Sequence, residues 1–342
     1  MIVLIFQGKL KFMEREIGCL KQPLEGHLQA CGPGRPRPAI TPLIALSFFL
    51  FNPYIAVRLR GKSQPYEPKV INHLKSRLKG VLPPRLEQGI RRLLLRRHIG
   101  TFPKRIVEHT YLGHPLKISI QDDLAKEWYD NLYASESMRE IEFLQRGRLK
   151  TGARVFDLGA HQAVVAMILA RVVGDSGSVI AVEGTRYNAD VAVENCRLNA
   201  ITNVTVKNAV AAEQAGLKMS FSATLNGSVG DNLLPVEVIS VSIDSLADEH
   251  GVPDVVFVDV EGYECQVLDG GKKALSAGTD FFVEVHTGAG LERHGSVEKV
   301  LAYFPAPKYT LFWSPSETAE FRPLTDRANA PRERFFLIAF AH

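Results

Sequence analysis

The chain has 342 residues, an apolar content that is ordinary for a globular protein, and a formal net charge of +4. This composition excludes a collagen, a coiled coil and a wholly disordered chain. Residues 1–110 carry 20 Lys and Arg against 6 Asp and Glu, whereas the rest of the chain has an excess of acids. The four cysteines show no CxxC or Cys/His spacing, so neither a disulfide framework nor a structural zinc site is expected.

Residues 1–105 are predicted to form a basic N-terminal extension, partly helical or poorly ordered. Within it, residues 31–38 (CGPGRPRP) indicate a turn-rich linker. Residues 39–57 are the only candidate for a membrane span, but Pro42, Asn52 and Pro53 interrupt the apolar run. We therefore expect an interfacial or packed segment there rather than a span.

Residues 84–98 are predicted to form a basic helix. Leu86, Ile90, Leu93 and Leu94 fall near one face, and the arginines fall mostly elsewhere. This pattern suits an anionic membrane surface or nucleic acid, although an ordinary surface helix would look the same. We expect a cytoplasmic protein, and peripheral contact with an anionic membrane through this region is left open.

Residues 106–342 are predicted to form an α/β domain with its core at 150–290. Residues 107–111 and 116–120 indicate two strands around a turn, and residues 122–149 indicate one or two helices. From residue 153 onward, strands and helices alternate, which predicts a mostly parallel sheet with helices on both faces. The predicted strands are 154–158, 178–182, 204–208, 254–259, 281–286, 309–313 and 334–340, with a β excursion at 217–222 and 236–243. The last two strands have no helix between them, which indicates a hairpin and an antiparallel edge strand.

The stretch Val155–Ala163 (VFDLGAHQA) has the order strand, tight loop, helix. Such loops at the carboxyl end of a parallel strand bind nucleotide-like cofactors, and Gly159 permits the sharp turn. Glu183 ends the next strand, where an acid can accept both hydroxyls of a ribose. The loop has a single glycine, which argues against a pyrophosphate and hence against a nicotinamide dehydrogenase. S-adenosylmethionine, which has no phosphate, is compatible with it.

Two further strand ends carry acids and an imidazole: Asp259 and Glu261 follow one strand, and Glu284 and His286 end the next. Because strand ends on one edge of a parallel sheet meet at one cleft, these groups are expected to lie beside the cofactor. Asp259, Glu261 and His286 are the predicted catalytic residues. Asp259 and Glu261 could instead cap the helix that follows, and Glu284 could face a buried partner without taking part in chemistry.

The chain resembles the FkbM family of S-adenosylmethionine-dependent methyltransferases over about residues 150–290. The resemblance rests on VFDLGAHQAV, VIAVEGTRYN, NVTVKNAVAAE, VSIDSLADE, VVFVDVEGYECQVLDGGKKAL and FFVEVH, in the family's order. It implies a Rossmann-like methyltransferase fold, with a mostly parallel seven-stranded sheet and a C-terminal antiparallel hairpin strand. It also implies transfer of a methyl group from S-adenosylmethionine to a small-molecule acceptor, most often to a hydroxyl of a sugar or polyketide.

The resemblance also implies roles for individual residues. The residues expected to bind the cofactor are Asp157, Gly159, Ala160 and His161 near its methionine end, Glu183 at its ribose, and Asn208 and Ala209 near its adenine. Asp259 and Glu261 would lie by the methyl group and the acceptor. The chain departs from the family pattern at Ala163, where members usually have a second glycine, and at Gly184, where a proline often follows the acid.

Several alternatives remain open at this point. A cation such as Mg²⁺ on Asp259, Glu261 and His286 is conceivable, but we favour the metal-free reaction. A nucleic-acid methyltransferase would use the basic arm, yet the tract that holds a flipped base's amino group is missing, so nucleic acid is not the expected partner. The third alternative is a degenerate methyltransferase that acts as a membrane- or partner-binding module.

Overall fold

The computed structural model describes residues 84–132, 138–222, 225–229 and 235–342. All of them belong to one compact unit. The predicted linker at 31–38 and the apolar segment at 39–57 therefore lie outside the described residues. Within the described part of the chain, no helix is long and apolar enough to cross a membrane. The expected domain boundary near residue 105 stays a prediction.

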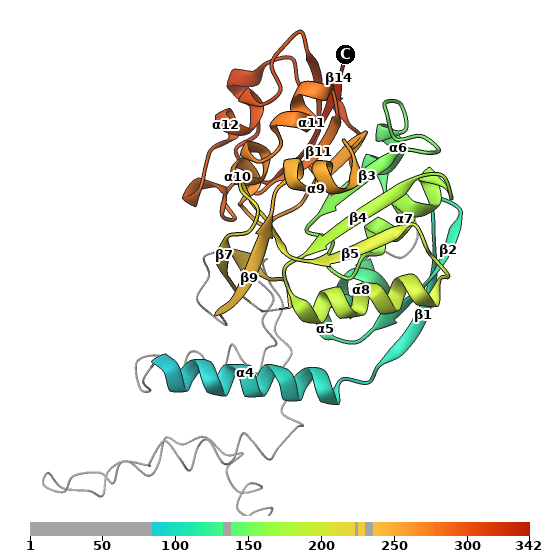
Figure 1. Cartoon of the computed structure of the whole chain (residues 1–342), viewed down its shortest axis with the longest axis vertical. Coiled ribbons are helices and arrows are strands. Elements are labelled where there is room, and N and C mark those ends of the chain that lie inside the picture. The colour runs from blue at the N-terminus through green and yellow to red at the C-terminus, as the bar shows by residue number, and fades with distance from the viewer. Residues whose placement is uncertain (1–83, 133–137, 223–224, 230–234) are drawn as a thin grey trace, which may run out of the picture. The chain divides into compact units, whose positions relative to one another are not determined.

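A single sheet of eight strands forms the centre of this unit (Figure 1). Its order is β13-β12-β14-β11-β10-β3-β4-β5. The bounds are β3 Arg154–Leu158, β4 Ser178–Glu183, β5 Val204–Asn208, β10 Val255–Val258, β11 Asp280–Val285, β12 Tyr309–Ser314, β13 Arg322–Pro323 and β14 Phe335–Ala341. The five strands from β5 to β11 are parallel, because each is followed by a helical crossover. The expected seven long strands are thus present, and the two-residue β13 adds an eighth.

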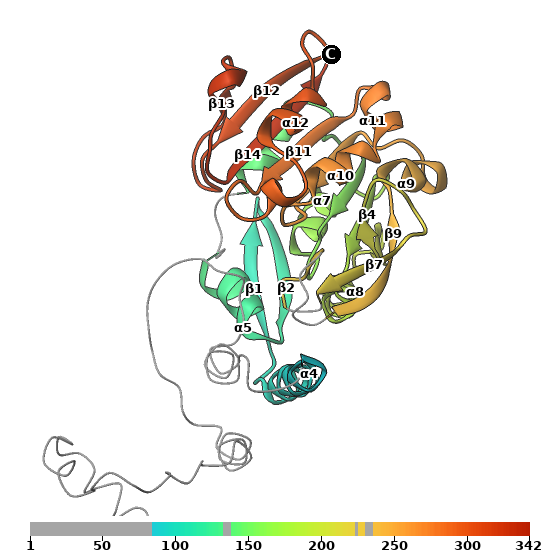
Figure 2. The ribbon, with the colours of Figure 1, turned by 90° about the vertical axis from the view of Figure 1, so that its left-hand side faces the viewer.

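The sequence led us to expect the antiparallel strand at the edge of the sheet. Among the long strands, the antiparallel one lies inside the sheet instead. Strand β14 lies between β11 and β12 and is antiparallel to both. Figure 2 shows β12, β14 and β11 side by side, with β13 outside them. Seven of the eight residues in the run 334–341 belong to β14, and five of those seven are buried. A strand this apolar is stable inside the sheet, where both of its edges are paired.

Helices cover both faces of the sheet, as doubly wound folds require. Helices α7 (Val164–Val173) and α8 (Arg186–Leu198) share one apolar core with the hairpin β1–β2. The other core contains residues of α9 (Ile243–His250), α10 (Glu264–Asp269), α11 (Lys272–Ala277) and α12 (Val297–Ala302). The predicted single helix at 263–276 is therefore two helices, and they are separated at Gly270 and Gly271. Short 3₁₀ turns lie at Leu291–Arg293 and Arg327–Asn329.

The segment before the first parallel strand confirms the predicted hairpin. Strands β1 (Arg105–Tyr111) and β2 (His114–Ile120) pair antiparallel, and β2 buries Leu116, Ile118 and Ile120. The region that was expected to hold one or two helices contains α5 (Asp123–Lys126), a π-helical turn (Glu127–Leu132) and α6 (Arg139–Leu144).

The predicted β excursion is a small separate sheet of β6 (Val210–Ala211), β7 (Lys218–Ser222), β8 (Ser228–Val229) and β9 (Pro235–Val241). The second strand ends earlier than expected. Ser242 is the N-cap of α9, and it exchanges hydrogen bonds with Ser245 in a capping box. The sequence SIDSLADEH was expected to be partly strand, and its capping serines explain why it forms a helix.

The basic helix is α4 (Pro84–Thr101), but its buried face differs from the predicted one. Leu95 is buried and packs with Leu124 and Leu225, and Leu94 lies against the same cluster. Leu86 and Leu93, which were assigned to the apolar face, are 53% and 60% exposed. The surface that α4 packs against, around Leu124 and Leu225, decides which of its side chains are buried. That surface contacts Leu95 and leaves Leu93 exposed. His98 fixes this orientation through a 2.6 Å contact with Asp123.

Candidate active site

The predicted site residues come together at the carboxyl edge of the parallel strands. Side chains alternate between the two faces of a strand, and Asp157, Asp259, Glu284 and His286 are all in phase with residues of the α7-side core, such as Val155, Phe257 and Phe282. They therefore lie on one face of three neighbouring strands. The prediction from strand ends that these groups share one site thus agrees with the observed register.

The loop after β3 requires glycine at position 159. Gly159 has a φ of +96°, and a β-carbon there would lie 1.7 Å from the carbonyl oxygen of Asp259. The backbone N–H groups of Gly159 and Ala160 both donate to the Val182 carbonyl, at 2.9 and 3.0 Å. The loop is thus fixed to β4 on one side and pressed against the end of β10 on the other.

The next residues adopt left-handed conformations without glycine. His161 and Ala163 have φ values of 48° and 62°. For an L-residue this conformation costs about 1–2 kcal/mol, so Ala163 occupies a position where glycine would be free of that strain. This is the position at which the chain departs from the family pattern. The backbone shape is retained there, and buried packing of the Ala163 methyl group offsets part of the strain.

The His161 ring is buried and held by its neighbours. Its Nδ1 lies 2.7 Å from the Tyr129 hydroxyl, its Nε2 lies 3.2 Å from the Leu225 carbonyl oxygen, and the ring packs against Trp128. Burial lowers the pKa of His161 to about 4, so the ring is neutral at physiological pH. The ring therefore positions the loop, and the backbone N–H of His161 donates to Glu183, the acid predicted to bind the cofactor.

Glu183 ends β4 with both carboxylate oxygens hydrogen-bonded. Oε2 accepts from the N–H of His161 at 2.9 Å, and Oε1 accepts from the N–H of Thr185 at 2.6 Å. Burial nevertheless raises its pKa to about 7. The side chains of Thr185 and Asn188 also hydrogen-bond to this carboxylate and oppose part of that rise in pKa. A ligand hydroxyl bound there would have to share the oxygens with these donors or displace one of them.

Asn208 and Ala209 lie next to Glu183 on the neighbouring strand. Asn208 pairs with Glu183 in the β4–β5 register, and its Nδ2 donates to the carbonyls of Glu183 and Gly184. The N–H of Ala209 also donates to the Glu183 carbonyl. Both residues thus fix the end of β4, and their predicted place near an adenine stays a prediction.

Asp157 is the buried acid at the end of β3. One of its oxygens, Oδ2, has no hydrogen-bond partner among the described residues. Burial raises its pKa to about 7. A buried carboxyl oxygen without a partner is costly, and such groups are typical of sites that bind a polar ligand.

A polar network that the sequence did not point to supports the same loop. The buried Gln162 donates from Nε2 to Asp122 at 2.8 Å, and the Asp122 carboxylate also accepts from the Tyr187 hydroxyl. Asn188 donates to the Leu225 carbonyl at 2.8 Å. These contacts join the loop after β3 to α8 and to the loop at 225–229, and they need long-range packing that no local motif indicates.

His286 is the centre of the second half of the site. Its Nδ1 lies 2.6 Å from the fully buried Glu264, while its Nε2 lies 3.1 Å from Glu284 and 3.6 Å from both Asp259 and Glu261. Burial alone would lower the pKa of His286, but the hydrogen bonds to Glu264 and Glu284 outweigh it and hold that pKa well above the ordinary value. His286 is therefore an imidazolium at neutral pH.

The acids around Nε2 differ in charge state. Withdrawal from water and repulsion by Glu284 raise the pKa of Asp259 well above its usual range, although its side chain is 45% exposed. Burial opposes ionisation of Glu284, but His286 and Arg334 together lower its pKa. Glu261 accepts a hydrogen bond from Asn226 at 2.7 Å. Asp259 is thus the acid of this cluster that is partly exposed and whose pKa is raised.

Two residues of this cluster were not among the predicted site residues. Glu264 was visible as the fifth residue after Asp259 in DVEGYE, but its contact with His286 depends on the turn at Gly262, whose N–H donates to Glu264 at 2.9 Å. Arg334 forms an ion pair with Glu284. It precedes β14, so only the internal position of that strand brings it to the site.

Three ligand atoms in this cluster lie close enough to hold a cation. One atom each from Asp259, Glu284 and His286 falls within 4.8 Å of the others. This set contains Glu284 where the sequence suggested Glu261. The protonated state of His286 and the ion pair of Glu284 with Arg334 both compete with a metal for these atoms.

Comparisons with known families agree with this arrangement. Residues 157–311 match the family of the methyltransferase FkbM domain. Residues 93–216 match the family of protein-L-isoaspartate(D-aspartate) O-methyltransferase. The comparison with curated proteins gives no match.

Solved structures of methyltransferases are also similar. They include a putative rRNA methylase from Clostridium thermocellum (16% identity, 59% of this chain and 93% of that chain, TM-score 0.37). An FkbM methyltransferase from Methylobacillus flagellatus KT has 17% identity and a TM-score of 0.37, and the match covers 55% of this chain and 43% of that one. An O-methyltransferase from Bacillus cereus in complex with SAH has 14% identity and a TM-score of 0.38, with 64% and 88% covered.

The matched segment begins at Asp157 and contains every predicted site residue, together with Glu264 and Glu284. Residues 157–311 therefore form a methyltransferase domain of the FkbM family.

Proposed function

We propose that this domain transfers a methyl group from S-adenosylmethionine to a hydroxyl of a small-molecule acceptor. The observation that carries the proposal is the position of Asp259. Its backbone carbonyl contacts the Gly159 turn, which with Asp157 and Glu183 forms the part of the site expected to bind the cofactor (the cofactor half). Its carboxylate lies beside His286 and the acids around it (the His286 cluster). One residue thus connects the place expected for the methyl donor with an acid that can accept a proton.

The cofactor half supplies groups suited to S-adenosylmethionine. The Glu183 carboxylate would accept the ribose hydroxyls in place of one of its side-chain donors. The Asp157 oxygen that has no partner among the described residues would accept from the ammonium group of the methionine moiety. When bound, the cofactor supplies an electrophilic methyl group on a sulfonium. Gly159 lets the turn pass directly against the Asp259 backbone, which would bring both strand ends beside that moiety.

The His286 cluster would prepare the acceptor. An acceptor hydroxyl next to Asp259 would donate its proton to that carboxylate as its oxygen bonds to the methyl carbon. The raised pKa of Asp259 favours this proton uptake. His286 would stay protonated, held at Nδ1 by Glu264, and would keep Asp259 oriented and balance the neighbouring negative charge.

The charge around the His286 cluster also favours a small-molecule acceptor over nucleic acid. Asp259, Glu261 and Glu284 converge on one imidazolium, so the surroundings of the acceptor carry net negative charge. A phosphate backbone would be repelled from such a site.

Cofactor binding and product formation test the proposal. Calorimetry should show binding of S-adenosylmethionine by the wild type and at least tenfold weaker binding by Asp157→Asn and Glu183→Gln. Mass spectrometry of extracts incubated with wild type should reveal a methylated product that is missing with Asp259→Asn. Cofactor binding that is intact in both Asp157→Asn and Glu183→Gln would overturn the cofactor assignment.

We also propose that α4 makes peripheral contact with anionic membranes. Leu86 and Leu93 are spaced seven residues apart on this helix and are exposed, and Arg92, Arg96 and Arg97 are exposed beside them. Exposed leucines flanked by arginines suit the boundary between lipid headgroups and acyl chains.

A further inference from the structure

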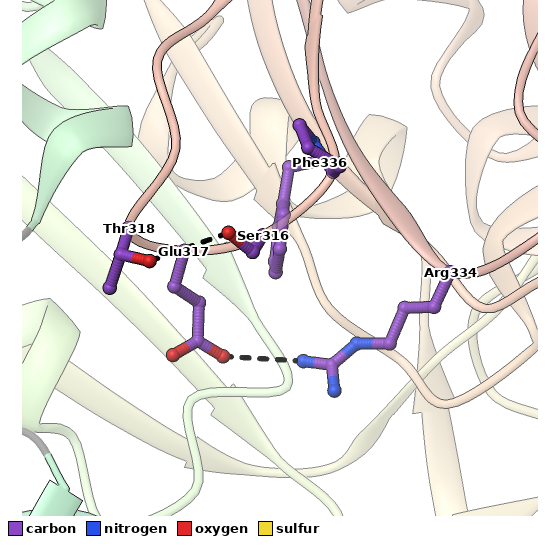
Figure 3. Close-up of a pocket in the computed structure, with 6 residues that line it drawn as sticks. Ser316, Glu317, Thr318, Arg334 and Phe336 are labelled. Atoms are coloured by element: carbon purple, nitrogen blue, oxygen red, sulfur yellow. Dashed lines mark hydrogen bonds and ion pairs between the residues drawn. The ribbon is translucent and has the colours of Figure 1, made fainter.

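A hollow of about 360 Å³ (Figure 3) is lined in part by Arg334, which forms an ion pair with Glu284 of the His286 cluster. It is lined by Pro315, Ser316, Glu317, Thr318, Arg334 and Phe336. All six residues follow the segment that matches the FkbM domain, which ends at residue 311. The hollow is therefore formed by a part of this chain to which the family match assigns no role.

The sheet register connects the hollow to the reaction centre. Phe336 of β14 is paired directly with Glu284 of β11, so the two side chains lie next to each other on the same face. Arg334, two residues earlier, forms an ion pair with Glu284 and also lies 3.4 Å from Glu317. A molecule in the hollow would thus contact Arg334 or Phe336, and Glu284 lies between these side chains and His286.

The charges around the hollow disfavour an anion. Arg334 is the only cation among the six lining residues, and it is shared between Glu284 and Glu317. Glu140 lies near both acids, and burial together with their repulsion raises its pKa to about 8. A phosphate or carboxylate ligand would have to compete with two carboxylates for one guanidinium.

The same groups suit an uncharged ligand with several hydroxyls. The Glu317 carboxylate accepts hydrogen bonds, the outer N–H groups of Arg334 donate them, and the exposed hydroxyls of Ser316 and Thr318, 3.4 Å apart, can do either. Figure 3 shows these polar groups around one opening, with the Phe336 ring behind them. The ring gives an apolar floor for the carbon face of such a ligand.

We propose that this hollow is a recognition subsite for the acceptor, and that it takes an uncharged, polyhydroxylated ring with adjacent hydroxyls. Glu317 is its specificity-determining residue. Arg334 is a positioning residue, because it holds Glu284 against His286 while it donates to the ligand. This proposal rests on the proposed function, since it supplies the acceptor for methyl transfer at Asp259.

Saturation-transfer NMR with defined probes tests the subsite. The probes are methyl glucopyranoside and methyl galactopyranoside, with glucose 6-phosphate as the anionic comparison, each recorded with and without S-adenosylhomocysteine. We expect the wild type to bind the neutral pyranosides and not the phosphate. Glu317→Gln, which keeps the size of the side chain but removes the charge, should weaken pyranoside binding about tenfold. Glu320→Gln is the matched control, because Glu320 lies on the same loop, is 90% exposed and is not among the lining residues.

The outcomes separate the two proposals. Binding of S-adenosylmethionine is measured for each protein by calorimetry, and it should be the same in wild type, Glu317→Gln and Glu320→Gln. Equal pyranoside binding by the two variants, a preference for the phosphate, or no pyranoside signal from the wild type would each overturn the subsite. If calorimetry shows no binding of S-adenosylmethionine by the wild type, the proposed function is overturned instead.

Discussion

The carbonyl oxygen of Asp259 occupies the space that a side chain on Gly159 would need, because it lies 1.7 Å from the position that a β-carbon would take there. The turn that follows β3 and the residue that follows β10 are therefore in direct backbone contact. This contact sets the distance between the loop expected to hold the methyl donor and the Asp259 carboxylate. A change at Gly159 should consequently affect stability and methyl transfer together.

Gly159→Ala should destabilise the domain by more than about 3 kcal/mol, because the added methyl group meets backbone and the φ of +96° is strained for alanine. Gly216→Ala is the matched control, since Gly216 has a φ of +81° and nothing within 4 Å of its β-carbon position. Gly216→Ala should lower the free energy of unfolding by about 1–2 kcal/mol, because only the backbone strain acts there. Urea denaturation measures both. Equal losses would show that the contact with Asp259 is unimportant for stability.

Cofactor binding should release protons below neutral pH. Burial raises the pKa values of Asp157 and Glu183 to about 7, so both carboxyls are largely protonated at pH 6 before binding. A cationic ligand beside Asp157 favours the ionised form and lowers that pKa, so a proton leaves on binding. Affinity should therefore rise from pH 5 to 7 and then level off.

Calorimetry at pH 6 in two buffers of different ionisation enthalpy measures this release. Asp157→Asn should bind with fewer protons released, whereas Asp190→Asn, a change at an exposed acid on α8, should behave like the wild type. A binding enthalpy that is the same in both buffers for the wild type would contradict the prediction.

Glu264→Gln should lower stability most at acidic to neutral pH. The hydrogen bond to Glu264 is the largest of the effects that raise the pKa of His286. A raised folded-state pKa stabilises the protein fully below the unfolded value, about 6.5, and this contribution is lost as the pH rises through the folded-state pKa. The variant should therefore be about 1–3 kcal/mol less stable at pH 6, with a smaller difference at pH 9.

Thermal denaturation between pH 5.5 and 9 follows this difference. Glu333→Gln, at an exposed position before β14, is the control and should leave the curve unchanged. A constant gap between Glu264→Gln and wild type over the whole range would mean that Glu264 acts by packing and not through the charge of His286.

Replacing both exposed leucines of α4 should weaken membrane contact. Leu86→Glu with Leu93→Glu removes two apolar side chains and adds two negative charges, so binding to vesicles containing phosphatidylserine should fall at least tenfold. Val193→Glu is the control, because Val193 is similarly exposed, at 55%, on α8. Co-sedimentation of the full chain measures the binding. Undiminished binding by the double variant would remove α4 as the contact.

Much of the fold follows from local patterns in the sequence. The alternation of apolar strands and helices placed β3, β4, β5, β10 and β11 within one or two residues. All five are bounded by turn residues, and all but the partly exposed β5 are buried. The rule that parallel strands end at one edge then brought Asp157, Asp259 and His286 together, as the register confirms. These features need no knowledge of distant contacts.

What was missed depends on distant pairing. The place of β14 between β11 and β12 is decided by which edge it meets, and its own sequence does not encode that choice. Arg334 was missed for the same reason. On α4, helical spacing located a stripe of leucines correctly, but the partner surface around Leu124 and Leu225 selected Leu95 over Leu93.

The internal position of β14 also sets an order of assembly. Strands β11 and β12 can join one sheet only after β14, some fifty residues further along than β11, has paired between them. Such non-local pairing is slow because its loop must close before the contacts form. Arg334 and Phe336 arrive with that strand. The cofactor half, built from strands close in sequence, can therefore form first, and the acceptor half is completed only by the final pairing event.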